Sequence, residues 1–131
     1  MKVNLKKMLG LTALGMTLLS NTVPTWAGSA GAPGVSIQSN STETTVYGSL
    51  TGARFSADGT QYIGCSINAA PYVYCYAQDS AGRFVGCVSY DAQLIGAVQT
   101  MTDSSSIRFD VKSGSSACTF LGIADKSYFL K

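Results

Sequence analysis

The sequence contains no histidine, and only 12% of its residues are charged. Histidine is the usual base that activates a serine or cysteine nucleophile, so nucleophilic catalysis of that kind is excluded. The cysteines lack the C-x2-C spacing of zinc sites, and Asp58-Gly59 lacks the alternating acids of a calcium loop. We therefore predict a protein that is not an enzyme, with no catalytic residue, no metal site and no cofactor.

An apolar run long enough to cross a bilayer is also missing. The uncharged run Met8–Ser20 is shorter than the roughly 20 residues that a membrane-spanning helix needs. Three lysines precede it, and Thr25 and Ala27 supply the small residues that signal peptidase recognises. The sequence therefore predicts a signal peptide at residues 1–27, a secreted or periplasmic location, and no membrane anchor after cleavage.

Positive charge is scarce in the chain that follows residue 27. These 104 of the 131 residues are enough for one domain, and they carry six basic against seven acidic side chains. The basic residues are scattered, so nucleic acid is not an expected partner. They are Arg54, Arg83, Arg108, Lys112, Lys126 and Lys131. Residues 28–44 are rich in Gly, Ser and Thr and are predicted to form a flexible leader, with partial order around Val35–Ile37. This leaves residues 45–131 as a single disulfide-stabilised, β-rich domain.

The first half of this domain has the pattern of short strands between turns. Val46–Phe55 and Gln61–Ile67 flank Asp58-Gly59, which is a strong hairpin signal. Tyr72–Gln78 and Arg83–Val88 follow, each bounded by turn-forming residues. We predict a four-stranded antiparallel meander, in which the first hairpin sets Phe55 opposite Tyr62.

The second half begins with a change of period. Leu94, Ile95, Val98 and Met101 recur at helical spacing after Asp91, which can cap a helix. The strands expected after this helix are Ile107–Val111, Ala117–Ile123 and a short Tyr128–Leu130. The predicted fold class is α+β and mainly β: a four-stranded meander, one helix, and two or three further antiparallel strands.

All four cysteines follow the signal peptide, and an even number in a small exported domain predicts two disulfides. The turn positions place Cys65 opposite Cys75, and Cys75 opposite Cys87, in one row. Two pairings remain open at this point. They are Cys65–Cys75 with Cys87–Cys118, which we favour, and Cys75–Cys87 with Cys65–Cys118.

The opposite side of the meander gathers aromatic residues. The same registers set Tyr76 between Gly64 and Gly86, where a ring lying across a glycine compensates for the missing side chain. We call this side the Tyr face. It comprises Tyr62, Tyr72, Tyr74, Tyr76 and Phe84. The helix or later strands would cover this face if it is core, whereas an exposed face is a candidate ligand surface.

Several stretches resemble a family of small exported bacterial proteins of unknown function. They are ADGTQYIGC at residues 57–65, the pattern from Cys75 to Arg83, the Asp91-Ala-x-Leu-Ile helix, and SIRFDVKSGSSAC at residues 106–118. The shared features include four cysteines and a YIGC-type hairpin. The resemblance covers residues 46–131 and implies no activity. The B subunits of bacterial AB5 toxins place a disulfide hairpin before a helix and then further strands, and here the segment from Cys75 to Cys87, the helix and Ser106–Val111 fall in the same order. This similarity implies a related fold and, by analogy, a glycan-binding domain.

The leading functional hypothesis is an exported, non-enzymatic binding or interaction module with an unknown protein or glycan as partner. An alternative is a secreted protease or hydrolase inhibitor that uses a rigid turn, either Asn68–Pro71 or Asp79–Gly82. The toxin-B-like glycan-binding domain is a second alternative, and a minor enzyme that uses carboxylates alone is a third.

Overall fold

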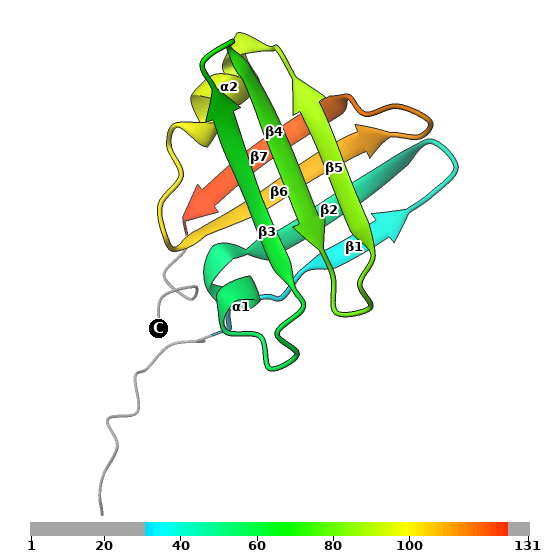
Figure 1. Cartoon of the computed structure of the whole chain (residues 1–131), viewed down its shortest axis with the longest axis vertical. Helices are drawn as coiled ribbons and strands as arrows, with labels where there is room; N and C mark the ends of the chain where they lie inside the picture. Colours follow the sequence, from blue (N-terminus) through cyan, green and yellow to red (C-terminus); the bar gives the residue numbers. More distant parts are fainter. Residues whose placement is uncertain (1–30, 126–131) are drawn as a thin grey trace, which may run out of the picture.

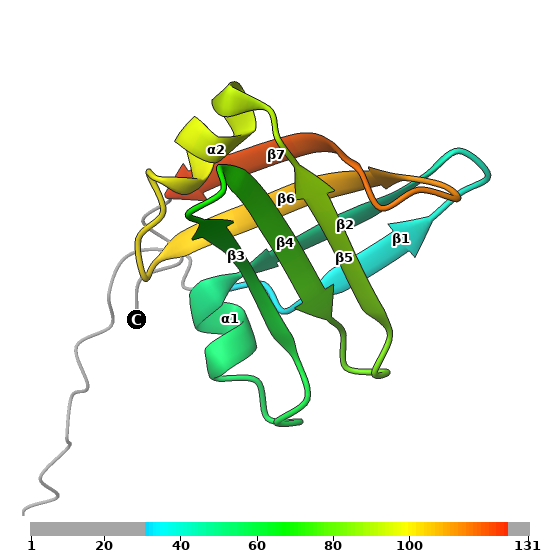
Figure 2. The same cartoon turned by 45° about the horizontal axis from the view of Figure 1, so that its top comes forward.

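The computed structural model describes residues 31–125. The expected signal peptide and the expected strand Tyr128–Leu130 lie outside this range. Two antiparallel sheets pack face to face, and their strands cross in the views of Figures 1 and 2. No helix in the described range is both long and apolar enough to span a bilayer.

The larger sheet has the strand order β1-β2-β6-β7. Its strands are β1 (Ser36–Ser39), β2 (Glu43–Ser49), β6 (Ser105–Lys112) and β7 (Cys118–Asp125). Alternate residues of each strand point to one side, and the apolar residues gather on the side that faces the smaller sheet. Val46 of β2 lies opposite Phe109 of β6, and both side chains are fully buried. Ile107 and Leu121 extend this core along β6 and β7.

The smaller sheet has the order β3-β4-β5 and supplies the other half of the core. Its strands are β3 (Tyr62–Asn68), β4 (Tyr72–Gln78) and β5 (Phe84–Ser89). Val73, Cys75 and Ala77 of β4 have no exposed surface, and the residues between them are half-buried. The predicted registers are confirmed here, because Cys65 faces Cys75 and Cys75 faces Cys87.

Two short helices connect the sheets. α1 (Leu50–Arg54) follows β2 directly, and α2 (Ala92–Val98) follows β5. The side chain of Asp91 accepts hydrogen bonds from the backbone N–H groups of Gln93 and Leu94, at 2.7 and 3.3 Å, which confirms the predicted cap. α2 packs against β7, β3 and β4, where its apolar residues complete the core.

The prediction of a strand over Val46–Phe55 is wrong in its second half. The hydroxyl of Ser49 accepts a hydrogen bond from the N–H of Gly52 at 2.8 Å, so Ser49 caps α1 and the strand ends there. β2 pairs with β1 and β6 and does not pair with β3. The predicted four-stranded meander is therefore a three-stranded one, and the first strand belongs to the other sheet.

The Asp58-Gly59 turn exists, but it does not close a hairpin. The Asp58 carboxylate accepts hydrogen bonds from the N–H groups of Thr60 and Gln61, and Gly59 has a φ of 63°. Such a turn is compatible with any change of chain direction, and here it leads from α1 into β3. The predicted pairing of Phe55 with Tyr62 is thus wrong.

The flexible leader predicted at residues 28–44 is wrong for most of the part that the structure describes, whereas the order expected around Val35–Ile37 is confirmed. β1 pairs with β2, and the side chains of Val35 and Ile37 are buried. A Cβ at Gly52 would overlap the carbonyl oxygen of Pro33, so this glycine lets the incoming segment lie directly against α1. Small residues allow this close approach, so the segment packs against the rest of the domain although it has few large side chains. The folded domain therefore begins before residue 45.

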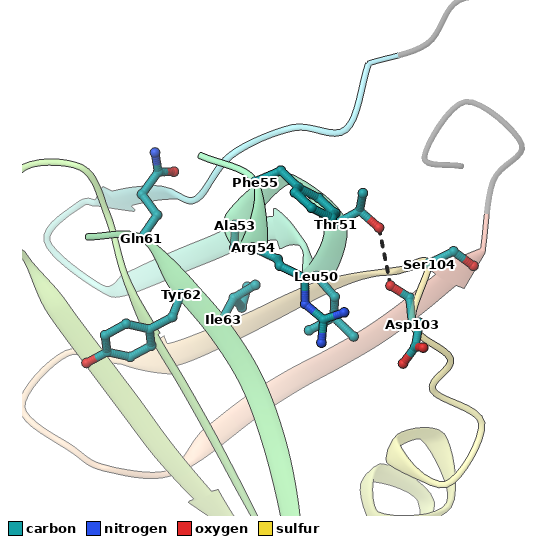
Figure 3. A pocket seen from close by; sticks show the side chains of 10 residues that line it. All are labelled: Leu50, Thr51, Ala53, Arg54, Phe55, Gln61, Tyr62, Ile63, Asp103 and Ser104. Carbon is teal, nitrogen blue, oxygen red and sulfur yellow. Dashed lines mark hydrogen bonds between the residues drawn. The ribbon is translucent and has the colours of Figure 1, made fainter. Parts of the chain in front are cut away.

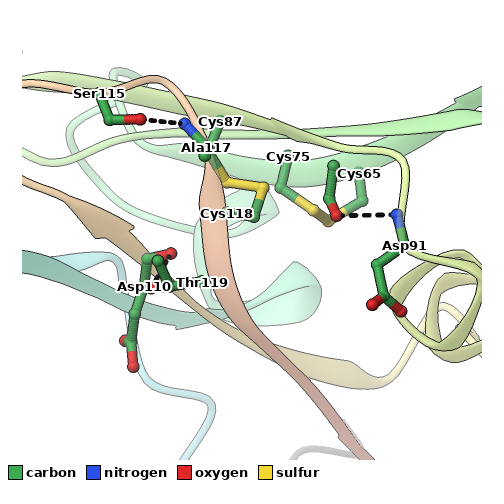
Figure 4. Close-up of a disulfide and its surroundings, with 10 residues drawn as sticks. Cys65, Cys75, Cys87, Asp91, Asp110, Ser115, Ala117, Cys118 and Thr119 are labelled. Carbon is green, nitrogen blue, oxygen red and sulfur yellow. Dashed lines mark hydrogen bonds between the residues drawn. A yellow bond between two sulfur atoms is a disulfide. The ribbon is translucent and has the colours of Figure 1, made fainter.

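The two disulfides have the favoured pairing (Figure 4). Cys65–Cys75 joins β3 to β4, with a Cα–Cα distance of 4.0 Å. Cys87–Cys118 joins β5 to β7 at 5.0 Å and therefore links the two sheets. We call it the inter-sheet disulfide. Beside it, the N–H of Val88 donates to the carbonyl of Ser116 at 2.8 Å.

Candidate functional site

The Tyr face is the outer surface of the three-stranded sheet. The side chains of all five residues point to one side of the sheet, and those of the buried Val73, Cys75 and Ala77 point to the other. Phe84 is 54% exposed and Tyr62 is 39% exposed, whereas Tyr72, Tyr74 and Tyr76 are half-buried. The larger sheet and α2 cover the cysteine side instead (Figure 1). The hypothesis that the Tyr face is core is therefore wrong.

The rings on this face contact one another. The ring centroids of Tyr74 and Tyr76 are 5.4 Å apart with planes at 29°, a stacked arrangement. Tyr62 packs against Tyr76 at 5.9 Å with its plane tilted by 60°. Tyr90, 75% exposed, lies 5.6 Å from Tyr72 and extends the aromatic surface beyond the predicted set. Tyr90 was missed because it lies just after β5, outside the strand alternation.

Two glycines explain how the rings lie against the sheet. A Cβ built on Gly64 would lie 3.6 Å from the Tyr76 hydroxyl oxygen, and one built on Gly86 would lie 2.8 Å from that of Tyr74. Tyr76 therefore covers Gly64, as expected, but Tyr74 rather than Tyr76 covers Gly86. The rings lean to opposite sides of β4, because each lies across a neighbouring strand where a glycine leaves room.

The outer face of these three strands carries no charged side chain. Besides the five aromatic residues, its positions are Gly64, Ser66, Asn68, Gln78, Gly86 and Val88. Ser66 and Asn68 are exposed, and the Tyr62 hydroxyl donates to the Gln78 side-chain oxygen at 3.3 Å. The surface thus combines flat apolar rings with a few neutral hydrogen-bonding groups.

The outer face of the larger sheet differs in chemistry. Arg108 lies over the ring of Phe120, 5.2 Å from its centroid, and forms an ion pair with Asp110 at 3.0 Å. Hydrogen bonding to Asp110 raises the pKa of the Arg108 guanidinium. Asp110 is 5% exposed, so this carboxylate is covered although it lies on the outer face of β6. This face is charged, whereas the Tyr face is neutral.

The turn between β4 and β5 is held by a buried carboxylate. Asp79 accepts hydrogen bonds from the N–H groups of Ala81 and Arg83, both at 3.0 Å, and pairs with the Arg83 guanidinium at 2.6 Å. Burial raises the pKa of Asp79, but the hydrogen bonds from Arg83 outweigh burial and hold this pKa below its usual value. Arg83 also donates to the carbonyl of Ile37 at 2.9 Å, which ties this turn to β1.

A cleft of about 600 Å³ lies at the edge of the smaller sheet (Figure 3). Its lining comes from α1, from the start of β3 and from the turn before β6. The lining residues are Leu50, Thr51, Ala53, Arg54, Phe55, Gln61, Tyr62, Ile63, Asp103 and Ser104. This cleft was not expected from the sequence, because residues 50–54 were predicted to be part of a strand and form α1 instead.

Within residues 31–125, no group of three His, Cys, Asp or Glu side chains is placed to hold a metal ion. Comparisons of the chain with family models, with curated proteins and with solved structures find no match.

Proposed function

We propose that this chain is an exported binding module without enzymatic activity, and that its Tyr face binds a neutral carbohydrate. The observation that supports this proposal is an exposed, uncharged aromatic surface on the three-stranded sheet. The faces of aromatic rings are electron-rich, and the C–H groups of a sugar ring are weakly positive, so the two stack favourably. Ser66 and Asn68 lie exposed on the same face, where they can hydrogen-bond to sugar hydroxyls.

The arrangement of the rings favours binding because the tyrosine side chains are already packed and lose little conformational entropy when a ligand binds. Tyr74 and Tyr76 lie against each other and across Gly86 and Gly64. On the reverse side of the same strands, the Cys65–Cys75 disulfide joins β3 to β4. A surface that is ordered before the ligand arrives retains more of the interaction energy as affinity.

The proposal of export is supported by the disulfides and by the N-terminal sequence. Two disulfides with no free cysteine among the described residues are compatible with an oxidising compartment, such as the periplasm or the medium. Residues 1–27 supply the predicted signal peptide.

A glycan array probed with the oxidised protein tests the proposal. We expect binding to a subset of neutral glycans, and we expect Tyr74→Ala and Tyr76→Ala each to weaken it about three- to tenfold, the equivalent of one aromatic contact. Phe120→Ala is the matched control, because Phe120 is an exposed aromatic residue (46%) on the other sheet. Intact disulfides and an unchanged circular dichroism spectrum confirm that each variant folds.

Two results would contradict this function. Equal losses in the Tyr74, Tyr76 and Phe120 variants would show that the Tyr face is not the site. Inhibition of a protease by the wild-type protein, unchanged in Tyr74→Ala but lost when the Asp79–Gly82 turn is cut, would instead support the inhibitor hypothesis.

A further inference from the structure

The cleft beside α1 is separate from most of the Tyr face and shares only Tyr62 with it. Its volume of about 600 Å³ is typical of sites for small molecules, which span roughly 300–1,000 Å³. Leu50, Ala53 and Ile63 form the apolar base of the cleft, and the more exposed rings of Phe55 and Tyr62 add apolar surface to its lining. A ligand that fits the cleft therefore needs an apolar part.

Two polar groups of the lining already serve the fold. The side-chain oxygen of Gln61 accepts from the N–H of Val35 at 2.6 Å, and its nitrogen donates to Asp58. The Thr51 hydroxyl donates to the backbone carbonyl of Asp103 at 3.3 Å, which holds the turn before β6 against α1. These contacts fix the shape of the cleft and leave both side chains with little capacity for a ligand.

Two charged side chains of the lining have opposite signs and remain available. Arg54 extends from the last turn of α1, and Asp103 extends from the turn before β6 (Figure 3). Both residues are exposed, and within residues 31–125 neither side chain has an ion pair or hydrogen bond. The cleft thus presents a cation and an anion, not paired with each other, around an apolar lining.

We propose that this cleft binds a free α-amino acid with an apolar side chain. The guanidinium of Arg54 takes the ligand's carboxylate, since its planar set of N–H donors matches that group. The carboxylate of Asp103 takes the ligand's ammonium group, and the side chain of the ligand packs on Leu50, Ala53 and Ile63. A simple carboxylic acid would be repelled by Asp103, and a simple amine by Arg54, so the zwitterion is the ligand that satisfies both charges.

Leucine and two derivatives, each missing one charge, provide the test. Leucinamide lacks the carboxylate, and N-acetylleucine lacks the ammonium group. In a nuclear magnetic resonance titration of the oxidised protein, we expect leucine to shift the backbone amide signals of residues 50–54, 61–63 and 103–104. Each derivative should bind at least about tenfold more weakly, because each loses one charge-assisted hydrogen bond.

Two variants assign each charge to its partner. In Arg54→Gln, leucine and leucinamide should bind equally, whereas N-acetylleucine should still bind more weakly than leucine. In Asp103→Asn, the pattern should reverse, so that leucine and N-acetylleucine bind equally. Lys112→Gln removes an exposed charge from another part of the surface and should leave all three affinities unchanged. Tyr74→Ala should also leave them unchanged, which keeps this test independent of the Tyr face.

Three results would overturn the proposal. The first is leucine causing no shift around the cleft up to its solubility limit. The second is N-acetylleucine binding as tightly as leucine to the wild-type protein, which would make the cleft a site for apolar carboxylates. The third is leucine binding with unchanged affinity to both Arg54→Gln and Asp103→Asn.

Discussion

Substitution of Gly86 by alanine should disturb the Tyr face from beneath. The new methyl group would lie 2.8 Å from the hydroxyl oxygen of Tyr74 and 3.2 Å from a carbon of its ring. Both distances are too short for carbon contacts, so the ring must move away from the sheet. Gly64→Ala is the matched control, because its methyl group would lie 3.6 Å from the Tyr76 hydroxyl, an ordinary contact distance.

The size of the effect follows from the difference between these two sites. Alanine in place of a strand glycine stabilises by roughly 0.5–1 kcal/mol when it fits, because the unfolded chain loses freedom. Gly64→Ala should show that gain. The Tyr74 atoms that must move are at the far end of a half-buried ring, and a strained rotamer costs about 1 kcal/mol, so Gly86→Ala should be about 1 kcal/mol less stable than Gly64→Ala. Urea unfolding of the oxidised variants measures this difference from their midpoints.

A double substitution identifies the cause. If the Tyr74 ring is responsible, Gly86→Ala should cost much less stability in a Tyr74→Ala background, and the coupling should amount to about 1 kcal/mol or more. Equal stability of Gly64→Ala and Gly86→Ala, with no coupling to Tyr74, would refute the placement of this ring over Gly86.

Three further predictions concern the rest of the chain. Mass spectrometry of the exported protein should give an N-terminus at Gly28 and two intact disulfides, and a retained N-terminal segment would contradict the signal peptide. The pKa of Asp79 is lowered in the folded state, so this carboxylate contributes its full stabilisation above the ordinary pKa near 4 and loses it as the pH falls through the lower folded-state pKa. In Asp79→Asn, the free energy of unfolding should therefore fall less steeply as the pH is lowered. An unchanged pH dependence of the free energy of unfolding would contradict this prediction. Removal of the inter-sheet disulfide by a double Cys→Ala substitution should lower the free energy of unfolding by about 1 kcal/mol more than removal of the Cys65–Cys75 disulfide, because the inter-sheet disulfide closes a loop of 31 rather than 10 residues. A smaller loss of stability on removing the inter-sheet disulfide than on removing Cys65–Cys75, measured by urea unfolding, would contradict this ordering.

The smaller sheet could be predicted from the sequence in detail because its information is local. Short turns at Asn68–Pro71 and Asp79–Gly82 join strands that alternate clearly, and the turn length sets the register. The facing pairs Cys65–Cys75 and Tyr76–Gly86 follow from that register alone. The favoured disulfide pairing is confirmed, but the register alone did not select it, because Cys75 faces both Cys65 and Cys87.

The assembly of the larger sheet could not be predicted because its central pairing, between β2 and β6, joins distant segments, although β1–β2 and β6–β7 are local pairs. β2 lies between β1 and β6, and β6 is separated from it by the whole smaller sheet. The sequence of residues 50–54 does not distinguish a short helix from a continued strand. The one local sign of a helix is the preceding Ser49, whose hydroxyl caps it. The role of Gly52 depends on Pro33, which approaches it only in the folded chain.

The exposure of the Tyr face could not be predicted either, because it also depends on long-range strand pairing. Strand alternation correctly grouped Tyr62, Tyr72, Tyr74, Tyr76 and Phe84 on one side. Which side of the sheet is covered is decided by the position of the other sheet, and that position follows from long-range pairing. The cleft between Arg54 and Asp103 was hidden for the same reason, since its walls are far apart in the sequence.

The inter-sheet disulfide also has a mechanical consequence. It closes a covalent ring that contains α2 and β6, and β6 is a central strand of the larger sheet. Tension applied to the two ends of the chain would pass through the sulfur–sulfur bond and bypass residues 88–117 entirely. A single cut by a protease in the exposed connection at residues 99–103 would likewise leave both fragments joined, so the molecule can be nicked there without coming apart.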